Sequence, residues 1–434
     1  MRALVGTTVD CTGIRADVAV IWEDSTIVDV VPRERLGDYD VDEIYGGKGY
    51  LVLPGFINSH THVAMAKFRG VGEDLPTPQW LSEVIWPAER EWTPREIHRW
   101  ALLGMAEVLS NGSTTINDHY FFAGEIAKVA EKLGVRAFVG QTVMDLVDFP
   151  LAAPEEGFRF FKRWDGKDSL VTPTLAPHAT NTVSLELMQE LGELAREKSV
   201  PIHVHLAQSR AEVLEVKRRY GTTPVRYLER AGVLGKSLLG VHGVYLEDGD
   251  VWRFGRSGAT LVHCPVSNVR LEARVPQVLK FENAGANVAL GNDSPNPVGL
   301  MDMFQEMRMV SLAYGITVGP SGRVGARKVF EWATVGGARA LGIRAGLIKS
   351  GYLADLILVN GRKPQFLPGE NIYSHVVYST RGSDVEMVFV DGEMVYRNGV
   401  LPKLGKTLED LWEELGGAYP LNLTEPPSPP SLSR

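Results

Sequence analysis

The sequence predicts an α/β fold: a (β/α)8 TIM barrel joined to a small β-sandwich domain that the two ends of the chain form together. Eight apolar, strand-like runs follow one another through the middle of the chain, and helical patterns separate most of them. Such alternation is typical of a parallel sheet, and eight units point to a closed barrel. Both ends carry short strands and turns instead. We expect the small domain over 1–54 and 356–420, the barrel over 55–355 and a flexible tail over 421–434.

The small domain is predicted from β-branched runs near both ends of the chain. Runs at 16–31 and 43–53 are separated by Asp- and Gly-rich connectors, which favour strands over helices. Runs at 351–360 and 384–399 have the same character, and the Asp391–Gly392 pair is typical of a tight hairpin turn. We therefore expect the two ends to pair into one small β domain. The Pro- and Ser-rich C-terminus predicts the tail.

The barrel strands are expected at eight apolar runs. These runs cover 52–62, 113–120, 136–143, 170–179, 200–208, 238–246, 259–268 and 287–294. One helical pattern begins at Thr93–Pro94 and ends at Asn111–Gly112, and another covers 184–198. Polar residues gather at the C-terminal ends of the strand-like runs, where barrels of this kind carry their active sites.

Composition limits the class and the setting of the protein. The chain has 434 residues, of which 44% are hydrophobic and 23% charged, with a net charge of −8. The negative charge argues against nucleic acid or an anionic membrane as a partner. No secretory signal is evident, and no run approaches the roughly 18 uninterrupted apolar residues of a membrane helix. Cys11 and Cys264 lack the spacing of a disulfide scaffold or a metal site, so we expect a cytoplasmic protein.

Four histidines and an aspartate stand at the ends of the strand-like runs. They are His60, His62, His205, His242 and Asp293. His60 and His62 are spaced i and i+2, so on a strand they share one face and can grip one ion together. Imidazoles with a carboxylate suit zinc or ferrous iron, and three or four such ligands leave a position for water. The ordered set therefore predicts a metal-dependent hydrolase.

Longer motifs carry a resemblance to a known family. PGFINSHTHVAM, RGVGEDLPTPQWLSEVIWPAE, HCPVSN and GYLADLILVN resemble the amidohydrolase superfamily, specifically the methylthioadenosine/S-adenosylhomocysteine deaminases and related triazine hydrolases. The resemblance covers nearly the whole chain. It implies that His60, His62, His205 and Asp293 bind the metal and that His242 acts beside the metal-bound water. It also implies a single ion, zinc or alternatively iron, because no lysine ends the fourth strand to bridge a second one.

The chemistry of these residue types agrees with that implication. A bound divalent ion lowers the pKa of its water toward about 7, which supplies hydroxide at neutral pH. Asp293 can take a proton from that water, while His242 orients it and stabilises the charge that develops. Attack on an sp2 ring carbon gives a tetrahedral intermediate that expels ammonia or another leaving group.

Three positions depart from the family pattern. Family deaminases have a glutamate acid where this chain has Gln208, and a glutamine donates a hydrogen bond but cannot deliver a proton. Losing a general acid typically lowers the rate by about 10²–10⁴-fold. Three explanations are open: the substrate ring needs no protonation, another group supplies the proton, or the enzyme is slow. Gln141 stands where family nucleoside deaminases place an arginine that contacts the far end of the substrate, and Asn181 stands where an aromatic residue is expected. Glu89 and His178, by contrast, match the family's ribose-binding glutamate and substrate-contacting histidine.

Other histidines leave alternatives open. His203 shares a strand face with His205, so spacing alone does not choose the ligand, although the resemblance and the strand end favour His205. His119 ends the second strand and faces either the pocket or the core; in the pocket its pKa, near 6.5 when unperturbed, would suit it to supply the missing proton. His263 is expected to be structural or to lie behind the ligands.

The remaining candidates have competing interpretations too. Trp80 and Trp86 are expected to close a hydrophobic lid or a subunit contact. Glu89 has the alternative of beginning a solvated helix face.

The predicted function is deamination of a heteroaromatic amine, either an adenosine-type nucleoside or a related purine, pterin or triazine. One alternative is hydrolysis of another C–N or C–Cl bond on an N-heteroaromatic ring, without the usual glutamate acid. The other is a metal-binding scaffold without catalysis, in which His242 would have no obvious use. The expected partner is a small-molecule substrate, and related barrels lead us to expect a homo-oligomer.

Overall fold

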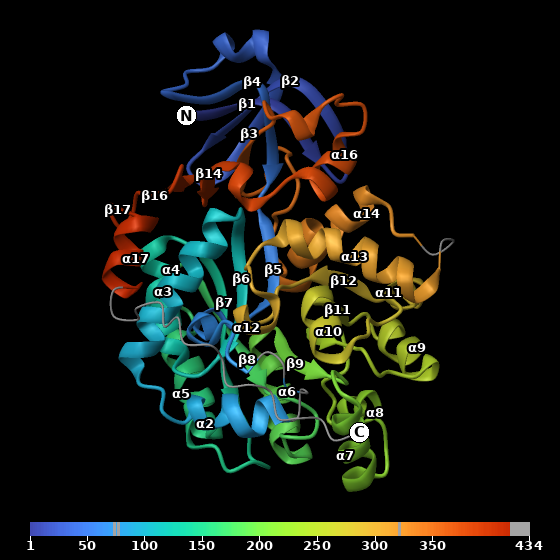
Figure 1. Ribbon diagram of the computed structural model, residues 1–434. Helices are drawn as coiled ribbons and strands as arrows, with labels where there is room; N and C mark the ends of the chain where they lie inside the picture. Colours follow the sequence, from blue (N-terminus) through green and yellow to red (C-terminus); the bar gives the residue numbers. More distant parts are fainter. Residues whose placement is uncertain (73–74, 76–78, 320–322, 417–434) are drawn as a thin grey trace.

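The computed structural model describes residues 1–72, 75, 79–319 and 323–416. Eight parallel strands follow one another in chain order around a nearly closed barrel (Figure 1). They are β5 (Phe56–Thr61), β6 (Ser113–Tyr120), β7 (Arg136–Val143), β8 (Val171–Pro177), β9 (Ile202–Leu206), β10 (Leu238–His242), β11 (Thr260–His263) and β12 (Asn287–Leu290). All eight predicted strands are confirmed. The tail predicted over 421–434 lies outside the described residues.

The barrel closes where its first and last strands meet. The backbone N–H of Asp293 donates to the carbonyl oxygen of His60 over 2.9 Å, and the N–H of His62 donates to the carbonyl oxygen of Asp293 over 3.4 Å. Asn58 and Asn292 lock the same seam, because the Asn58 amide donates to Asn292 Oδ1 and the Asn292 backbone N–H donates to Asn58 Oδ1. Closure therefore places His60, His62 and Asp293 side by side.

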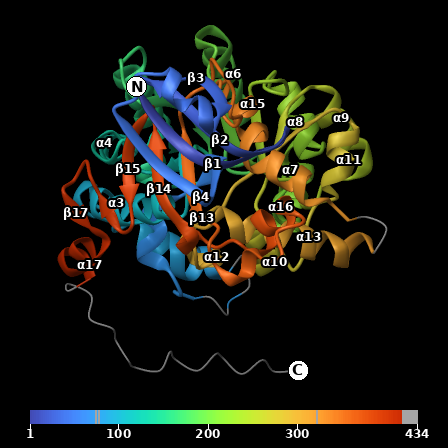
Figure 2. The ribbon, with the colours of Figure 1, turned by 90° about the horizontal axis from the view of Figure 1, so that it is seen from above.

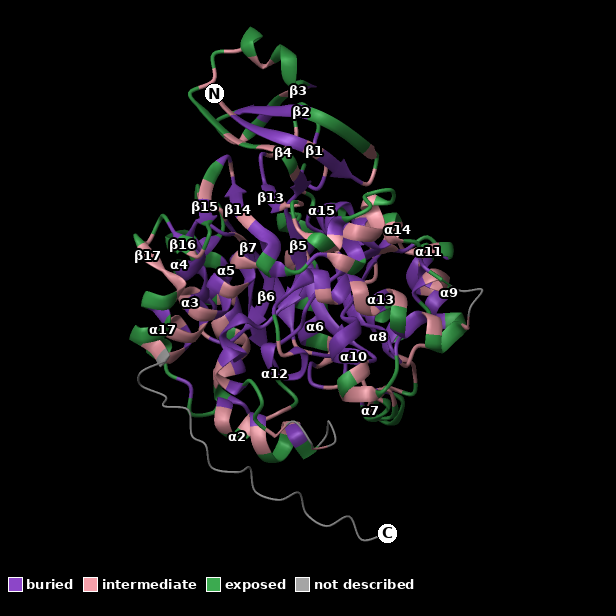
Figure 3. Ribbon diagram, turned by 45° about the horizontal axis from the view of Figure 1, so that its top comes forward, coloured by how far each residue is buried: buried purple, intermediate pink, exposed green. Residues whose placement is uncertain are grey.

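Helices cover the outside of the barrel. They are α3 (Pro94–Ser110), α4 (Ala123–Leu133), α5 (Pro154–Trp164), α6 (Leu185–Lys198), α7 (Arg210–Tyr220), α8 (Pro224–Arg230), α9 (Asp248–Arg256), α10 (Pro265–Glu272), α11 (Val278–Asn283), α12 (Pro295–Val298), α13 (Met303–Val318), α14 (Ala326–Glu331) and α15 (Gly337–Leu341). The predicted start of α3 is confirmed: Thr93 and Glu96 form a reciprocal capping box, and Asn111 caps the other end. Figure 3 shows buried strands inside and exposed residues on the outer helix faces.

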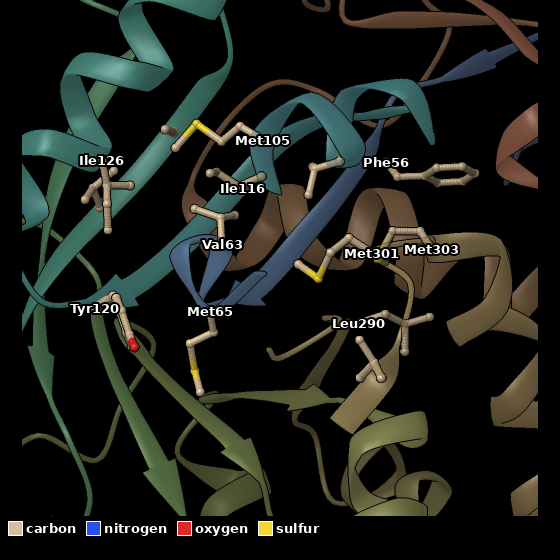
Figure 4. Packing of buried hydrophobic residues seen from close by; sticks show 14 of the residues in the cluster. Phe56, Val63, Met65, Met105, Ile116, Tyr120, Ile126, Leu290, Met301 and Met303 are labelled. Atoms are coloured by element: carbon tan, nitrogen blue, oxygen red, sulfur yellow. The ribbon is translucent and has the colours of Figure 1, made fainter. Parts of the chain in front are cut away.

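Apolar side chains fill the layer between strands and helices. Figure 4 shows Val63 of η2 (Val63–Phe68) close to Met105 of α3 and Ile116 of β6. All three side chains are fully buried. Burial of a side chain of this size stabilises the fold by about 1.5–3 kcal/mol. This packing fixes the ends of β5 and β6, from which site residues project.

The N- and C-terminal segments form one mixed sheet of nine strands. Its order is β17-β16-β15-β14-β13-β4-β1-β2-β3. The strands are β1 (Arg2–Asp10), β2 (Gly13–Glu23), β3 (Thr26–Pro32), β4 (Glu43–Pro54), β13 (Leu356–Asn360), β14 (Val385–Val390), β15 (Glu393–Arg397), β16 (Val400–Leu401) and β17 (Lys406–Thr407). The central neighbours β4 and β13 come from opposite ends of the chain, and Figure 2 shows these segments crossing over the barrel.

This sheet folds over itself, as the predicted sandwich requires. The rings of Trp22 in β2 and Phe389 in β14 have centroids 5.2 Å apart, although three strands lie between them in the sheet order. The Trp22 indole N–H also donates to the carbonyl oxygen of Gly392 over 3.0 Å. Asp391 and Gly392 have φ values of +54° and +77°, which confirms the predicted tight turn between β14 and β15.

Shorter elements complete the described chain. They are η1 (Arg33–Asp38), η3 (Trp80–Ile85), α2 (Trp86–Glu89), η4 (Pro150–Ala152), η6 (Trp332–Gly336), η7 (Pro364–Phe366), α16 (Ile372–Ser374), η8 (His375–Ser379), η9 (Gly382–Asp384) and α17 (Leu408–Gly416). None of the described helices has the length and apolar character needed to cross a membrane.

Candidate metal and active site

The predicted ligand residues meet at the C-terminal mouth of the barrel. His60 and His62 project from the end of β5 and its following residue, and Asp293 follows β12. The Nε2 atoms of His60 and His62 lie 3.5 and 3.4 Å from Asp293 Oδ1. His205 from β9 completes the group, with its Nε2 3.4 Å from His62 Nε2. Four predicted ligands thus converge from three strands.

The other ring nitrogens of two histidines are held by backbone carbonyls. His62 Nδ1–H donates to the oxygen of His119 over 2.5 Å, and His205 Nδ1–H donates to the oxygen of His178 over 2.6 Å. Such bonds fix the tautomer, leaving the Nε2 lone pair free, and they orient the ring. The arrangement is therefore set up to present Nε2 atoms to a metal.

A divalent ion fits this group of donors. His60 Nε2 and His242 Nε2 are buried, and neither has a hydrogen-bond partner within the described part of the chain. Buried nitrogens rarely lack a partner, so these two lone pairs call for a ligand. His60, His62 and His205 form one possible metal-binding group, and His60, His242 and Asp293 form another. Nitrogen donors with one carboxylate suit zinc or iron.

His203 lies behind the ligand group rather than in it. His60 Nδ1 and His203 Nε2 are 2.9 Å apart. When His60 Nε2 binds the metal, the proton of His60 is on Nδ1, and this Nδ1–H donates to His203 Nε2. Neither of the metal-binding groups among the described residues includes His203. This geometry supports His205 as the ligand and His203 as the residue that orients His60.

Asp293 is held by polar neighbours on both sides. The Ser267 hydroxyl donates to Asp293 Oδ2 over 2.5 Å, and His242 Nε2 lies 3.9 Å from the same oxygen. Burial raises the pKa of Asp293, but the adjacent imidazole rings of His60 and His62 outweigh burial and hold that pKa well below its usual range. Asp293 and His242 have φ values of +72° and +78°, a region that non-glycine residues occupy when the surroundings enforce it.

A cavity of about 280 Å³ opens beside the ligand group. Its inner part includes His62, His205 and Asp293. Its apolar wall is built from side chains of several segments that follow the barrel strands: Met65, Trp80, Leu81, Ile85, Trp86, Phe121, Met144 and Leu271. The predicted lid residues Trp80 and Trp86 thus line a small-molecule pocket, and this cavity has the mixture of apolar wall and few polar groups that such pockets show.

Glu89 lies in this cavity and not on a solvated helix face. The Tyr120 hydroxyl donates to Glu89 Oε1 over 2.6 Å, and the Trp92 indole N–H donates to the Tyr120 oxygen over 3.0 Å. Burial raises the pKa of Glu89 to about 7. Among the described residues, only Tyr120 donates to this carboxyl group, which leaves Oε2 as an acceptor for a bound molecule.

His119 and His178 also line the cavity. The His119 ring is buried, and both of its nitrogens lack partners among the described residues; its centroid lies 4.9 Å from that of His205. His178 Nδ1 is hydrogen-bonded to Thr182 Oγ1 over 2.9 Å, and burial lowers the pKa of His178 to about 4. At neutral pH His178 is therefore an uncharged hydrogen-bonding group.

Gln208 lines the cavity, and a neighbouring glutamate that the sequence analysis missed holds its backbone. The N–H of Gln208 donates to Glu212 Oε2, and the N–H of Ala207 donates to Glu212 Oε1, both over 2.9 Å. The Thr180 hydroxyl also donates to Glu212 Oε1. The Ser209-x-x-Glu212 spacing at the start of α7 was the available signal.

Two further positioning residues were missed within the HCPVSN motif. Ser267 contacts Asp293, as described above. The Asn268 side-chain oxygen accepts the Nδ1–H of His242 over 2.8 Å, and the Asn268 amide lies 3.4 Å from His263 Nδ1. His263 therefore lies behind the site, as predicted.

The structure places the side chain of Gln141, a predicted substrate contact, outside this cavity. Its Oε1 accepts the N–H of Ala123 over 3.1 Å, and its Nε2 donates to the oxygen of Leu151 over 2.9 Å. Side chains alternate along a strand, so Thr142 points into the cavity and Gln141 points toward the helices. Asn181, by contrast, is part of the cavity wall.

Comparisons with known proteins agree with this geometry. The sequence profile of the amidohydrolase family matches residues 51–395. A 5'-deoxyadenosine deaminase of Methanothermobacter thermautotrophicus is 38% identical over 398 residues, covering 91% of this chain and 92% of that protein. A 5-methylthioadenosine/S-adenosylhomocysteine deaminase of Pyrococcus furiosus is 37% identical over 393 residues, covering 89% and 92%. A solved adenosine deaminase from Xanthomonas campestris with bound zinc has a TM-score of 0.89 and 28% identity, covering 96% of each chain.

Proposed function

This chain belongs to the amidohydrolase family, and on that premise we propose that it is a metal-dependent deaminase of adenosine-type nucleosides or related N-heteroaromatic amines. The observation that carries the proposal is the convergence of His60, His62, His205 and Asp293 beside a small-molecule cavity. Relatives named as deaminases match about nine-tenths of the chain and support the reaction type.

We propose that the four converging residues hold one ion, zinc in the first instance. When bound, such an ion lowers the pKa of a coordinated water toward about 7 and so supplies a nucleophile at neutral pH. The Nδ1 hydrogen bonds of His62 and His205 support this assignment, because they leave both Nε2 atoms free. β8 ends at Pro177 without a lysine that would bridge a second ion.

Asp293 is the proposed general base. Its carboxylate takes a proton from the attacking water as the oxygen adds to the ring carbon, and it returns that proton to the amine, which leaves as ammonia. His242 Nδ1–H donates to Asn268, so Nε2 is an acceptor that orients a water O–H near Asp293. The products are the hydroxylated heterocycle, in its lactam form, and ammonia.

The cavity supplies the proposed substrate contacts. Glu89 accepts hydrogen bonds from sugar hydroxyls, and His178 and His119 offer ring nitrogens to the heterocycle or sugar. Gln208 donates its amide to a ring nitrogen without transferring a proton. Gln141 takes no part in this assignment, because its amide is bonded to Ala123 and Leu151.

We further propose a cytoplasmic homo-oligomer. Both cysteines are free thiols, which supports a reducing compartment. Leu312 and Ile316 expose 57% and 87% of their surface one helical turn apart on α13, which supports a subunit contact. Light scattering during size-exclusion chromatography of wild type and Ile316→Glu tests the oligomer.

An ammonia-release assay on zinc-loaded protein tests the function. A panel of adenosine, 5'-deoxyadenosine, 5'-methylthioadenosine, guanine and an aminotriazine covers the substrate classes. We expect ammonia from at least one nucleoside, and none from Asp293→Asn under the same conditions. Wild-type protein that holds about one zinc per chain but releases no ammonia from any compound would overturn the proposal.

A further inference from the structure

The cavity wall carries carboxylates but no permanent cation. No lysine or arginine occurs among the described residues that line it, whereas Glu89, Glu212 and Asp293 all do. Of the residues outside the description, 73–74, 76–78 and 320–322 contain no lysine or arginine in sequence. Away from the proposed metal position, an anionic group in this cavity would meet Glu89 and Glu212 with no lysine or arginine side chain beside it.

Two arginines on nearby segments are already engaged. Arg219 donates to the carbonyl oxygen of Asn181 over 3.3 Å and pairs with Glu215 over 2.8 Å. Arg90 donates to the carbonyl oxygen of Asp148 over 2.5 Å, and its guanidinium lies 4.9 Å from the ring centre of Phe149. Neither arginine lines the cavity.

The part of the wall built by η3 and α2 is apolar. Trp80, Leu81, Ile85 and Trp86 all line the cavity, and Leu271 of α10 joins them. The Trp80 indole N–H donates to the carbonyl oxygen of Val71, so its ring remains for apolar contact. This wall can bury a methyl or alkylthio group. An ionised group placed against it would lose its hydration without gaining a hydrogen bond or an opposite charge.

We propose that the cavity selects adenosine-type nucleosides with an uncharged, apolar 5' substituent and discriminates against 5'-phosphate and 5'-amino-acid ends. The inference rests on the proposed function. In adenosine the reacting amine and the 5' carbon lie at opposite ends of the molecule. With the amine at the ligand group, the 5' substituent points away from that group, and we place it against the apolar wall formed by η3 and α2. The names of the relatives include both neutral and charged substrates, so they do not decide this point.

A pair of substrates matched in length separates charge from size. The kcat/KM of wild type is measured for 5'-methylthioadenosine, 5'-n-butylthioadenosine, S-adenosylhomocysteine and AMP. We expect S-adenosylhomocysteine and AMP to be at least about tenfold poorer than the butylthio compound, because unpaired charge costs more than added length. A difference below about tenfold overturns the inference while the deaminase function stands. Failure to deaminate any of the four overturns the inference, and the deaminase function then depends on the guanine and aminotriazine of the wider panel.

An arginine introduced into the cavity wall tests whether the lack of positive charge causes the discrimination against charged 5' substituents. Asn181 lines the cavity and is partly exposed, so its position has room for a longer side chain. The quantity compared is the kcat/KM for 5'-n-butylthioadenosine divided by the kcat/KM for S-adenosylhomocysteine. Asn181→Arg should lower this ratio by at least about tenfold, and the neutral control Asn181→Gln should change it by less than about threefold. Circular dichroism and zinc content confirm that both variants fold. An unchanged ratio in folded Asn181→Arg would overturn the inference.

Discussion

The Nδ1–H of His242 donates to the side-chain oxygen of Asn268 over 2.8 Å. His242 is buried, and burial lowers its pKa, so at neutral pH the ring is uncharged and this bond decides which nitrogen carries the proton. Nε2 is left as an acceptor facing Asp293. Asn268, which does not line the cavity, therefore sets the chemistry of His242.

Replacing Asn268 should damage turnover without removing the metal. Asn268→Leu keeps the approximate shape but loses the acceptor, so kcat should fall by about 10–100-fold, the usual effect of losing such a partner. Zinc content, measured by elemental analysis, should stay at the wild-type level. Asn268→Asp retains an acceptor oxygen and should recover part of the loss. If Asn268→Leu proved as active as wild type, the tautomer of His242 would not matter.

The two histidines of β9, His203 and His205, provide a test of metal binding and its matched control. His205→Ala removes a proposed ligand and should abolish stoichiometric zinc. His203→Ala removes only the acceptor of the His60 N–H, so zinc should remain with about 10–100-fold weaker affinity. Zinc competition with a fluorescent chelator measures both. Loss of zinc in His203→Ala with retention in His205→Ala would reverse the assignment.

Asp293→Asn should abolish deamination and weaken zinc binding together. The substitution removes the proposed base and a charged ligand, so we expect a loss of at least about 10²–10⁴-fold in kcat. Added zinc should raise the Tm of wild type, because a ligand that binds only the native state stabilises it, and should raise that of Asp293→Asn less. Ser267→Ala, which removes only the hydroxyl donor to Asp293, serves as the milder control. Activity above about a tenth of wild type in Asp293→Asn would refute its role as base.

Gln208→Glu tests why the family acid is missing. If ring protonation limits the rate on adenosine-type nucleosides, the restored carboxyl should raise kcat by about tenfold or more. If the natural substrate has a good leaving group, as in C–Cl hydrolysis, Gln208 acts as a hydrogen-bond donor and the same change should impair turnover. The kcat for an adenosine-type nucleoside divided by the kcat for a chlorinated heterocycle, measured in wild type and in Gln208→Glu, distinguishes these cases. No effect on either class would show that position 208 does not face the reacting ring.

Glu89→Gln should alter the pH dependence of stability. Burial raises the pKa of Glu89 from 4.5 to about 7 in the folded protein. Below about 4.5 both states are protonated and nothing is lost; between 4.5 and 7 only the unfolded state ionises, so stability falls as pH rises. The variant lacks this penalty, and its advantage over wild type should grow by up to about 3 kcal/mol between pH values of about 5 and 8. Urea unfolding at both pH values measures the difference in the free energy of unfolding between the variant and wild type. The same difference at both pH values would contradict the burial of an ionising group.

The barrel and its ligand set were predictable because their signals are local. Each barrel strand is an apolar run of its own, and a ligand at the end of a parallel strand must lie at the barrel mouth. The spacing of His60 and His62 on one strand also needs no tertiary information. The confirmed start of α3 at Thr93 depends on a four-residue motif alone.

The missed features depend on relationships that no short stretch contains. β7 is buried on both faces, so its sequence shows no alternation to tell that Thr142 faces the cavity and Gln141 the helices. The bond between Ser267 and Asp293 joins helix α10 to the connection between β12 and α12. The bond from the Thr180 hydroxyl to Glu212 likewise joins the segment that follows β8 to α7.

The pairing of β4 with β13 has a consequence for biosynthesis. Pro54 and Leu356 are partners in this ladder, yet about 300 residues separate them. At roughly 5–20 residues per second, a ribosome needs about 15–60 s to make the intervening chain. For that time β4 lies with one edge unpaired, and such edges invite pairing with other chains. Nascent chains arrested before residue 356 should therefore need chaperones, and proteolysis of such chains should cut β1–β4 faster than in the finished protein.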